Sequence, residues 1–404
     1  MAKDSGPARP DQHTIGERLA QLRAAAGMTQ TGLAARSGVS IEIIRKLEQG
    51  QRHTTSIPNL HKLAGALDVD AGALLSKPAQ LPAEDGSGAV AIRRTLTSVD
   101  DLVDDQPDTE PLTTDEARAA LTYGWGSYWS GRYDQLGVML PDAIGRARAT
   151  LRAVAADDRA EAADLAAQVL QLSACTLVHL GYLDIAHMAL REALDHASAG
   201  SDPLRVHAIR GSVSWVLLVE GRFLEAGKVA ASAAGQLDPN GSSSLPEWTL
   251  YGSLLLSSAT AAGRAGDRAS ALALVDEAGV AAEQTGYRND YELAFGEHQV
   301  AMQRVDVETV TENYASALTA AQKLPRNSSL PLAARARHMS DKALAHVRLG
   351  HDDVAFQVLD EMADMAPSWA AYQEQPRSIY RELRERAANP PRLVELGRKL
   401  RVSA

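Results

Sequence analysis

The sequence predicts an all-α protein in two parts: a bundle of five short helices, then a long array of helical hairpins. Hydrophobic residues make up 45% of the 404 residues but aromatic residues only 4%, so alanine and leucine supply most of the packing. This composition favours helices, because aromatic and β-branched residues are the usual strand formers. The length exceeds that of one ordinary core, which indicates several domains or a repeat array.

The first part, residues 13–76, follows an arm at residues 1–12 that we expect to be flexible. Apolar residues recur here at the spacing of helices with one buried face: Ile15, Leu19, Leu22, Leu33, Ala34, Ile44, Leu47, Leu60, Leu63, Ala64 and Leu67. Thr29, Ser40 and Asp70 are expected to cap helices, and Gly27 and Gly50 to end them. Gly38 is available for a turn with positive φ.

Residues 77–113 are predicted to be a linker, because proline, glycine and acidic residues replace the helical spacing. Residues 89–96 could form a short helix within this linker. The acidic run at residues 99–111 is expected to be solvated.

The second part, residues 114–404, repeats one element: an apolar helix, a glycine with a polar or aromatic pair, and an alanine-rich helix. The turn glycines are Gly131, Gly181, Gly221, Gly266 and Gly350. The last gap is about twice the others, so we expect a missing turn at residues 304–310. A small residue follows four of the turns at a helix-contact position: Ala186, Ala226, Ala271 and Ala355. Such hairpins bury their faces only by stacking, which predicts a superhelix with a concave surface.

The first part resembles the Cro/C1-type helix-turn-helix domain of the xenobiotic response element family. The resemblance rests on Met28-Thr29-Gln30, Leu33-Ala34, Ser37-Gly38-Val39-Ser40 and Ile44-x-x-Leu47-Glu48-Gln49-Gly50. It implies that the third helix lies in the major groove of a double-stranded DNA operator, with its N-terminal residues at base edges. It also implies a homodimer on a pseudo-palindromic site.

Carried over residue by residue, the resemblance implies a set of DNA contacts: Gln30, Ser40, Ile41, Glu42, Arg45, Lys46, Gln49, Gln51 and Arg52. Arg45 and Lys46 can donate to guanine and are the expected base readers. Gln30, Ser40, Gln49, Gln51 and Arg52 are expected near the DNA backbone.

Three residues of the third helix need a separate interpretation. Glu42 could accept a hydrogen bond from cytosine, or pair with Arg45 at i+3 and orient it, and we favour the pair. Ile41 could pack on a thymine methyl group or join the core beside Ile44. Glu48 is expected to tie the domain together.

Residues 114–404 resemble the C-terminal region of actinobacterial helix-turn-helix regulators with tetratricopeptide-like domains. The matching segments include YxxGRYDxL (128–136), LYGSLLLSSATAAGRAGDRASAL (250–272), EQTGYRNDYELAFGEHQVAMQRVDV (283–307) and the run from 335 to 367. The resemblance implies a tetratricopeptide-like α-solenoid that acts as a sensor or interaction domain. In the resembling group Phe295-Gly296 is usually followed by Pro-Thr-Asn-Val, which is absent here. Either the ligand differs, or this segment is structural.

Aromatic residues are rare, so their clustering is informative. They gather between Tyr123 and Tyr133, where they could line a pocket or pack the first hairpin, and we favour packing. Trp215, Tyr251 and Phe295 are expected in the first helices of later repeats, which line the concave side. The candidate ligand-binding residues are Trp125, Tyr128, Trp129, Trp215, Tyr251, Phe295, His298 and Gln299.

The sequence offers little support for catalysis or a metal site. Cys175 and His179 share a helix face, but no orienting group or oxyanion site accompanies them, so a buried cysteine beside a satisfied histidine is expected. A single cysteine excludes a multi-cysteine metal site, and the histidines lack ligand spacing. No phosphate-binding or dinucleotide-binding glycine motif is present. We therefore expect neither an enzyme nor a cofactor.

Charge and targeting patterns complete the prediction. The first 76 residues carry a net charge of +2 and the remainder −12, within a total of −10. No signal peptide or membrane-spanning run is visible. The sequence predicts a cytoplasmic, sequence-specific DNA-binding transcriptional regulator whose array senses a small molecule, peptide or protein and mediates oligomerisation. The alternative is a protein–protein interaction platform that the first domain tethers to DNA.

Overall fold

The protein is all-α, as predicted. The computed structural model describes residues 14–52, 55, 57–69, 74, 87–99, 109–325, 327–386 and 391–402. Within these residues the secondary structure is helical, apart from one isolated bridge between Arg288 and Phe295. The chain divides into two compact units, residues 1–77 and residues 78–404. The predicted flexible arm lies outside the described residues, as does most of the acidic run.

The first unit contains four described helices: α1 (Ile15–Ala25), α2 (Gln30–Ser37), α3 (Ile41–Glu48) and α4 (Ile57–Leu67). The predicted caps Thr29 and Ser40 are confirmed, whereas the predicted cap Asp70 lies outside the described residues. Thr29 accepts a hydrogen bond from the Gly32 amide at 3.0 Å, and Ser40 accepts one from the Ile43 amide at 3.3 Å. Gly38 adopts φ 69°, so it supplies the left-handed turn between α2 and α3.

The core of this unit is formed by the predicted apolar positions. Leu19, Leu33, Ile44, Leu47, Leu60 and Leu63 are almost fully buried. Gly16 allows α1 to cross α3 closely, because a Cβ atom there would lie 1.8 Å from the Leu47 carbonyl oxygen. The predicted fifth helix falls mostly outside the described residues, although Leu74 is buried in this core.

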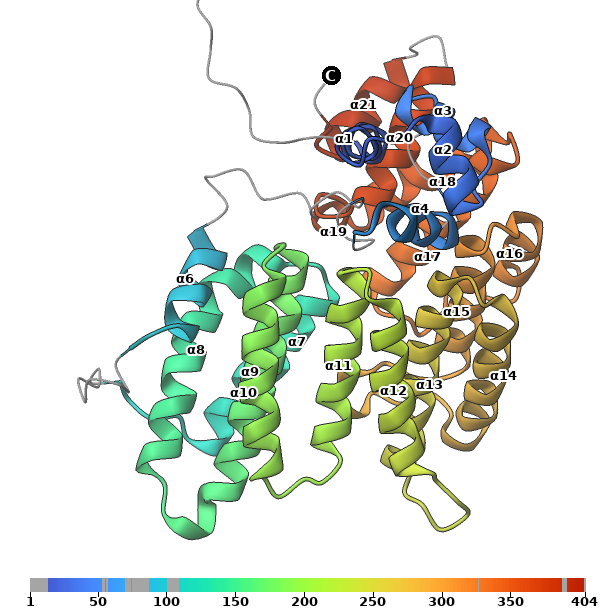
Figure 1. Ribbon diagram of the computed structural model, residues 1–404. Helices are drawn as coiled ribbons and strands as arrows, with labels where there is room; N and C mark the ends of the chain where they lie inside the picture. Colours follow the sequence, from blue (N-terminus) through green and yellow to red (C-terminus); the bar gives the residue numbers. More distant parts are fainter. Residues whose placement is uncertain are drawn as a thin grey trace, which may run out of the picture. The chain divides into compact units, whose positions relative to one another are not determined.

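The second unit begins with α6 (Ser87–Leu96), so the predicted linker contains the short helix expected there. Figure 1 labels the helices that follow. They are α7 (Thr114–Trp129), α8 (Tyr133–Ala153), α9 (Arg159–His179), α10 (Leu183–Ser198), α11 (Arg205–Val219), α12 (Phe223–Leu237), α13 (Leu245–Ala265), α14 (Arg268–Thr285), α15 (Glu297–Val310), α16 (Tyr314–Ala321), α17 (Leu332–Arg348), α18 (Asp352–Met365), α19 (Pro367–Ala370), α20 (Glu374–Arg386) and α21 (Pro391–Lys399).

These helices pair into antiparallel hairpins that turn in the same way. The five predicted turn glycines all have positive φ, between 72° and 91°. The residue after each glycine donates its amide to a carbonyl in the last turn of the preceding helix at 2.9 Å, as Arg132 does to Ser127. The glycine therefore ends one helix and reverses the chain into the next.

One predicted turn was wrong. Residues 304–310 belong to α15, and the reversal follows at Glu312, which takes the left-handed conformation with φ 63°. Asn313 then donates to Glu308 at 2.8 Å, as in the other hairpins. Because no glycine marks this turn, its place is hidden in the sequence.

Alanines let the hairpins pack closely. Ala186, Ala226, Ala271 and Ala355 are completely buried, as predicted. At the start of the array, Gly88 of α6 lies against Gly137 of α8, where a Cβ atom would lie 2.7 Å from the Gly137 Cα. Small side chains thus set the distance between neighbouring helices.

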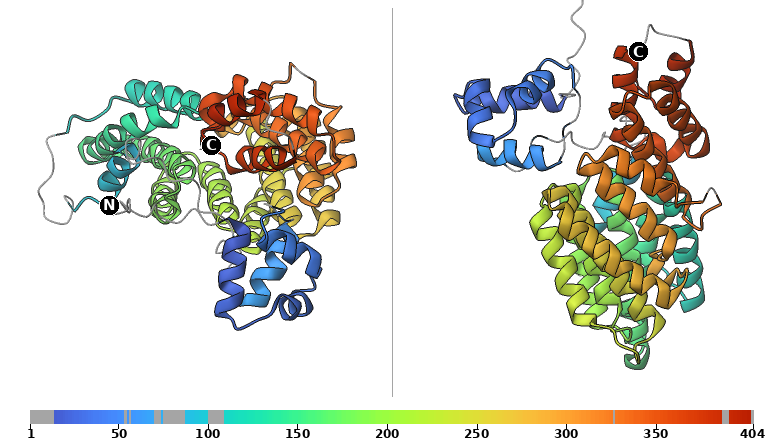
Figure 2. Two further views of the ribbon diagram at one scale, coloured as in Figure 1. Left: turned by 90° about the horizontal axis from the view of Figure 1, so that it is seen from above. Right: turned by 90° about the vertical axis from the view of Figure 1, so that its right-hand side faces the viewer.

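The array closes on itself. Gly131, at the first hairpin turn, lies so near Trp369 of α19 that a Cβ atom would lie 2.9 Å from the Trp369 Cβ. The rings of Tyr133 and Tyr372 also meet edge to face at 5.4 Å. Figure 2 shows the C-terminal helices, in red, beside the teal hairpin that begins the array. None of the described helices is both long and apolar enough to cross a membrane.

Candidate DNA-binding surface and ligand pocket

The short helix α3 exposes a row of polar side chains. Glu42, Arg45 and Lys46 are all exposed on it. Glu42 pairs with Lys46 at 2.8 Å rather than with the predicted Arg45, because i+4 neighbours also share one helix face. This hydrogen bond lowers the pKa of Glu42. Arg45 makes no ion pair within the described residues, so its guanidinium is available to an acceptor in a groove.

The other predicted DNA-contacting residues surround this helix. Ile41 is half-buried at the first position of α3, and it lies outside the apolar core formed by Ile44 and its neighbours. Gln49 and Gln51 are exposed after the helix, and Arg52 is half-buried with its amide bonded to the Lys46 carbonyl at 2.9 Å. Ile41 thus lies at the start of α3, whereas Gln49, Gln51 and Arg52 follow its end.

A bidentate ion pair fixes α3 against the preceding helices. Arg23 of α1 donates to both carboxylate oxygens of Glu48, at 2.7 and 2.8 Å, which confirms the structural role predicted for Glu48. Gln30 also donates to Glu48 at 2.8 Å. Burial raises the pKa of Glu48, but these hydrogen bonds outweigh it and leave that pKa lowered. The Gln30 side chain is therefore already engaged within the domain.

A cavity of about 150 Å³ lies within the array, lined by the first helices of four hairpins and by one loop. Four of the predicted ligand-binding residues line it, namely Trp125, Tyr128, Trp129 and Trp215. Trp125 and Tyr128 are less than one-tenth exposed and meet edge to face at 5.3 Å. The aromatic cluster near the start of the array therefore both packs the first hairpin and lines the cavity.

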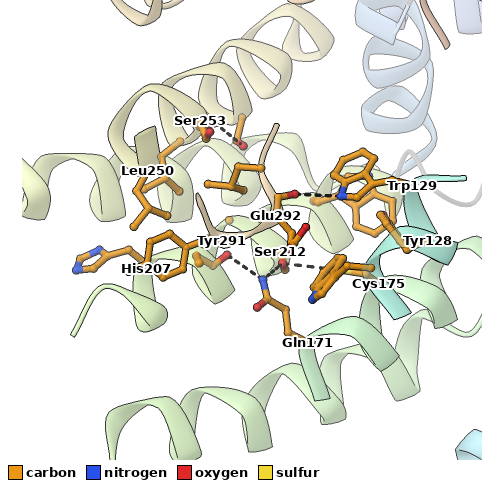
Figure 3. A pocket seen from close by; sticks show the side chains of 17 residues that line it. Tyr128, Trp129, Gln171, Cys175, His207, Ser212, Leu250, Ser253, Tyr291 and Glu292 are labelled. Carbon is orange, nitrogen blue, oxygen red and sulfur yellow. Dashed lines mark hydrogen bonds between the residues drawn. The ribbon is translucent and has the colours of Figure 1, made fainter. Parts of the chain in front are cut away.

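Neutral polar groups line another wall. Figure 3 shows Gln171, Cys175 and Ser212 together. Gln171 donates to the Ser212 hydroxyl at 2.9 Å. Sequence reasoning missed Gln171 and Ser212, because they lie about 40 residues apart on different helices and only the fold joins them.

The loop between α14 and α15 closes the cavity. Its 3-10 turn η3 (Asp290–Glu292) contributes Tyr291 and Glu292, and Figure 3 shows Glu292 beside Trp129. Trp129 donates its indole N–H to the Glu292 carbonyl at 3.2 Å. Burial raises the pKa of the Glu292 carboxyl group. The sequence hints at this loop only through the polar run between Gly286 and Gly296.

The backbone of this loop is strained. Tyr291, Glu292 and Ala294 have φ of 55°, 60° and 47°, which side-chain-bearing residues rarely adopt. A relay holds the loop: Asp164 accepts from the Ser201 amide at 2.8 Å, and neighbouring Asp202 accepts from the Tyr291 hydroxyl at 3.0 Å. The fold thus imposes on this loop a conformation that its local sequence disfavours.

The remaining predicted ligand-binding residues lie away from the cavity. Phe295 precedes α15 instead of lying within a helix, and it is fully buried against Gly252, which makes it a core residue. Tyr251 bonds to Glu277. His298 bonds to Ser329 at 2.9 Å, and Gln299 is half-buried on the first turn of α15. The segment that departs from the resembling group therefore does not line this cavity.

Cys175 and His179 form no nucleophile–base pair. Burial raises the pKa of the Cys175 thiol to about 12, and its sulfur lies 3.7 Å from the Ser212 hydroxyl. Burial also lowers the pKa of His179 to about 3, while its ring stacks on Tyr133 at 4.2 Å. The thiol stays protonated and the imidazole neutral at physiological pH, as the interpretation of a buried pair requires.

Comparisons with known proteins concern mainly the first unit. A family model described as a helix-turn-helix domain matches residues 14–76. The chain is 38% identical over 68 residues to the uncharacterized HTH-type transcriptional regulator y4dJ of Sinorhizobium fredii, a match that covers 17% of this chain and 87% of the relative. The crystal structure of Bacillus thuringiensis PlcR in complex with the peptide PapR7 and DNA is similar at 12% identity and a TM-score of 0.34. That alignment covers 76% of this chain and 94% of PlcR.

Proposed function

We propose, from the premise that this chain belongs to the family of helix-turn-helix transcriptional regulators, that it binds a double-stranded DNA operator in the cytoplasm. The observation that carries the proposal is α3, a capped helix that exposes Arg45 and is held by the Arg23–Glu48 pair. In this proposal Arg45 donates a hydrogen bond to guanine in the major groove, and Lys46 contacts DNA once its ion pair with Glu42 opens. Gln49, Gln51 and Arg52 face the phosphates.

The structure bears on the proposed roles of three residues. Glu42 orients Lys46 through their 2.8 Å ion pair, and a direct contact to cytosine would require that pair to open. Gln30 supports Glu48, so its contribution to DNA binding comes through its backbone amide at the start of α2. Ile41 lies outside the core cluster, which favours a contact to a thymine methyl group.

We further propose that the protein binds DNA as a homodimer, because one short helix makes few base contacts and two half-sites double them. The array would then set the separation of the two recognition helices. Light scattering of the purified protein, free and bound to a DNA fragment with two half-sites, checks the dimer, and a monomer in both samples contradicts it.

The array is proposed to sense an effector in the cavity lined by Trp125, Trp129 and Trp215. A volume of about 150 Å³ suits a small molecule or one peptide side chain better than a folded protein. The closing loop touches the bound group through Tyr291 and Glu292, so a ligand alters the contacts that hold this loop.

Fluorescence anisotropy with DNA from upstream of the protein's own gene tests the DNA proposal. The affinity for DNA is expected to fall steeply as the salt concentration rises, because the basic side chains that contact phosphates displace counterions from the DNA. The double variant Arg45→Ala, Lys46→Ala should lose most of the sequence preference. The proposal fails if no fragment shows salt-dependent binding.

A thermal-shift screen tests the sensor proposal separately. A small molecule or short peptide that binds the folded array should raise its Tm. A protein that raises the Tm, in a screen where small molecules and peptides do not, would instead favour a docking platform tethered to DNA.

A further inference from the structure

The proposed effector cavity has a distinctive chemical lining. Three tryptophans and two tyrosines contribute to its wall: Trp125, Tyr128, Trp129, Trp215 and Tyr291. Among the residues that the structure describes, Glu292 is the only acidic side chain in the lining, and neither lysine nor arginine lines the cavity. Burial lowers the pKa of the nearby His207, so this histidine stays neutral at physiological pH.

The two arginines near the closing loop already have carboxylate partners. Arg205 lies over the Tyr291 ring, 4.6 Å from its centroid, and pairs with Asp202 at 3.5 Å. Arg288 pairs with Asp290 at 2.5 Å. With Asp164 and Glu292, which also act on Arg205, these two arginines face four carboxylates. The surroundings of the closing loop therefore carry an excess of negative charge.

A third cation, Arg337, acts electrostatically on His179. Its charge is countered by Asp306 at 2.8 Å. Asp306 also binds Arg264 at 3.0 Å, and the buried Asp341 lies in the same cluster. These charges balance one another, so they do not offset the charge of Glu292.

We propose that the effector is a small organic cation, an amine or quaternary ammonium carrying a small apolar group. This inference rests on the proposed sensor function and names the chemistry of its site. The faces of tryptophan and tyrosine attract cations electrostatically, and the attraction grows when water is excluded. Glu292 provides the counter-charge, and the neutral amide and hydroxyl of Gln171 and Ser212 bind a polar substituent. A carboxylate ligand would meet no cationic partner in this lining.

Isothermal titration calorimetry on the full chain tests the inference with two matched pairs of probes. Choline is compared with its neutral isostere 3,3-dimethylbutan-1-ol, and 2-phenylethylammonium with 2-phenylethanol. We expect at least one cation to bind about tenfold more tightly than its neutral partner. Equal or tighter binding of both neutral partners overturns the inference, as does the absence of heat from both cations at about 10 mM.

Two variants locate the cation. Trp129→Leu removes an aromatic face, and Glu292→Gln removes the counter-charge while keeping the backbone carbonyl that accepts from Trp129. Each should weaken cation binding by about fivefold or more. The controls Tyr123→Leu, on the same helix, and Glu283→Gln, on α14, change exposed residues outside the cavity lining and should leave affinity unchanged. A thermal melt of each variant verifies that it folds.

The outcomes separate this inference from the function on which it rests. If the neutral probes bind the protein and Trp129→Leu abolishes that binding, the cavity would remain the proposed sensor site, but the inference of a cationic effector would be overturned. An unchanged cation affinity in both variants would overturn the assignment to this cavity. Failure to bind DNA would remove the proposed regulator yet would not alter the calorimetric comparison.

Discussion

The candidate DNA surface lies within residues 23–52, whereas the candidate ligand pocket draws on four helices and a loop between Trp125 and Leu293. The first is exposed and held by one bidentate ion pair and a few caps. The second lies between stacked helices, and its shape depends on how successive hairpins pack together. A substitution in the first unit should therefore affect only nearby contacts, whereas one near the pocket should alter the packing of several hairpins.

The largest expected effect separates the stabilities of the two units. Gly16→Val places a Cβ atom into the Leu47 carbonyl and should cost the first unit about 3 kcal/mol, most of what a domain of this size possesses. Hydrogen exchange measured by mass spectrometry should show fast exchange in α1–α4 and an unchanged array. The control Gly65→Ala, where a Cβ meets open space, should instead stabilise α4 by about 0.5–1 kcal/mol. Equal loss of protection in both units would contradict their independence.

The next effect concerns DNA affinity alone. Arg45→Ala removes the one exposed cation of α3 that makes no described ion pair, and should weaken operator binding by about 30-fold. Anisotropy titrations at fixed salt measure this change. The control Lys228→Ala removes an exposed charge from α12 and should leave affinity unchanged. Equal weakening by both variants would mean that only net charge matters.

As pH falls, the contribution of His179 to the stability of the array should be lost before that of the Glu48 ion pair to the first unit. His179 has a pKa lowered to about 3 by burial, from 6.5. Between these two pKa values only the unfolded chain protonates this histidine. The contribution of His179 to the stability of the array is therefore fully present above pH 6.5 and decreases as the pH falls below it. Glu48 has a lowered pKa, so its contribution persists above about 4.5 and is lost at lower pH.

Urea denaturation at pH 7 and pH 5 should show that His179→Gln removes about 1–2 kcal/mol of this pH dependence from the array. His351→Gln changes an exposed histidine and serves as the control. An unchanged pH dependence in His179→Gln would show that His179 is not responsible.

The smallest expected effect sharpens the interpretation of Glu42. Glu42→Gln releases Lys46 from their ion pair and removes an acid from the DNA-facing helix. Operator affinity should rise about two- to fivefold, with a steeper salt dependence and the same preferred sequence. A changed base preference would instead identify Glu42 as a base reader.

The two regions also differ in what the sequence predicts. In the first unit, the capping residues and turn glycines directly adjoin the apolar helical pattern in the sequence. The roles of Thr29, Ser40 and Gly38 were therefore predicted correctly. The hairpin turns of the array were equally predictable wherever a glycine marked them, and Glu312 was missed because a left-handed residue with a side chain carries no such mark.

The pocket resisted prediction for a physical reason. Its walls come together only when hairpins about 40 residues apart are stacked. The rarity and clustering of aromatic residues therefore identified the aromatic wall, whereas nothing in the sequence marked its neutral partners. Phe295 is an aromatic residue of the kind that lines pockets, yet it packs closely against Gly252 and belongs to the core. Tyr291 and Glu292 lie in a strained loop outside the repeat, which no periodic pattern describes.

The contact between Gly131 and Trp369 limits how this array can evolve. An open solenoid gains or loses repeats by duplication or deletion, since each new unit meets only its neighbours. Here an extra hairpin would carry α19 away from the first turn and would separate Tyr133 from Tyr372. These contacts thus fix the number of hairpins, so we expect related arrays to vary in their side chains and loops rather than in their number of repeats.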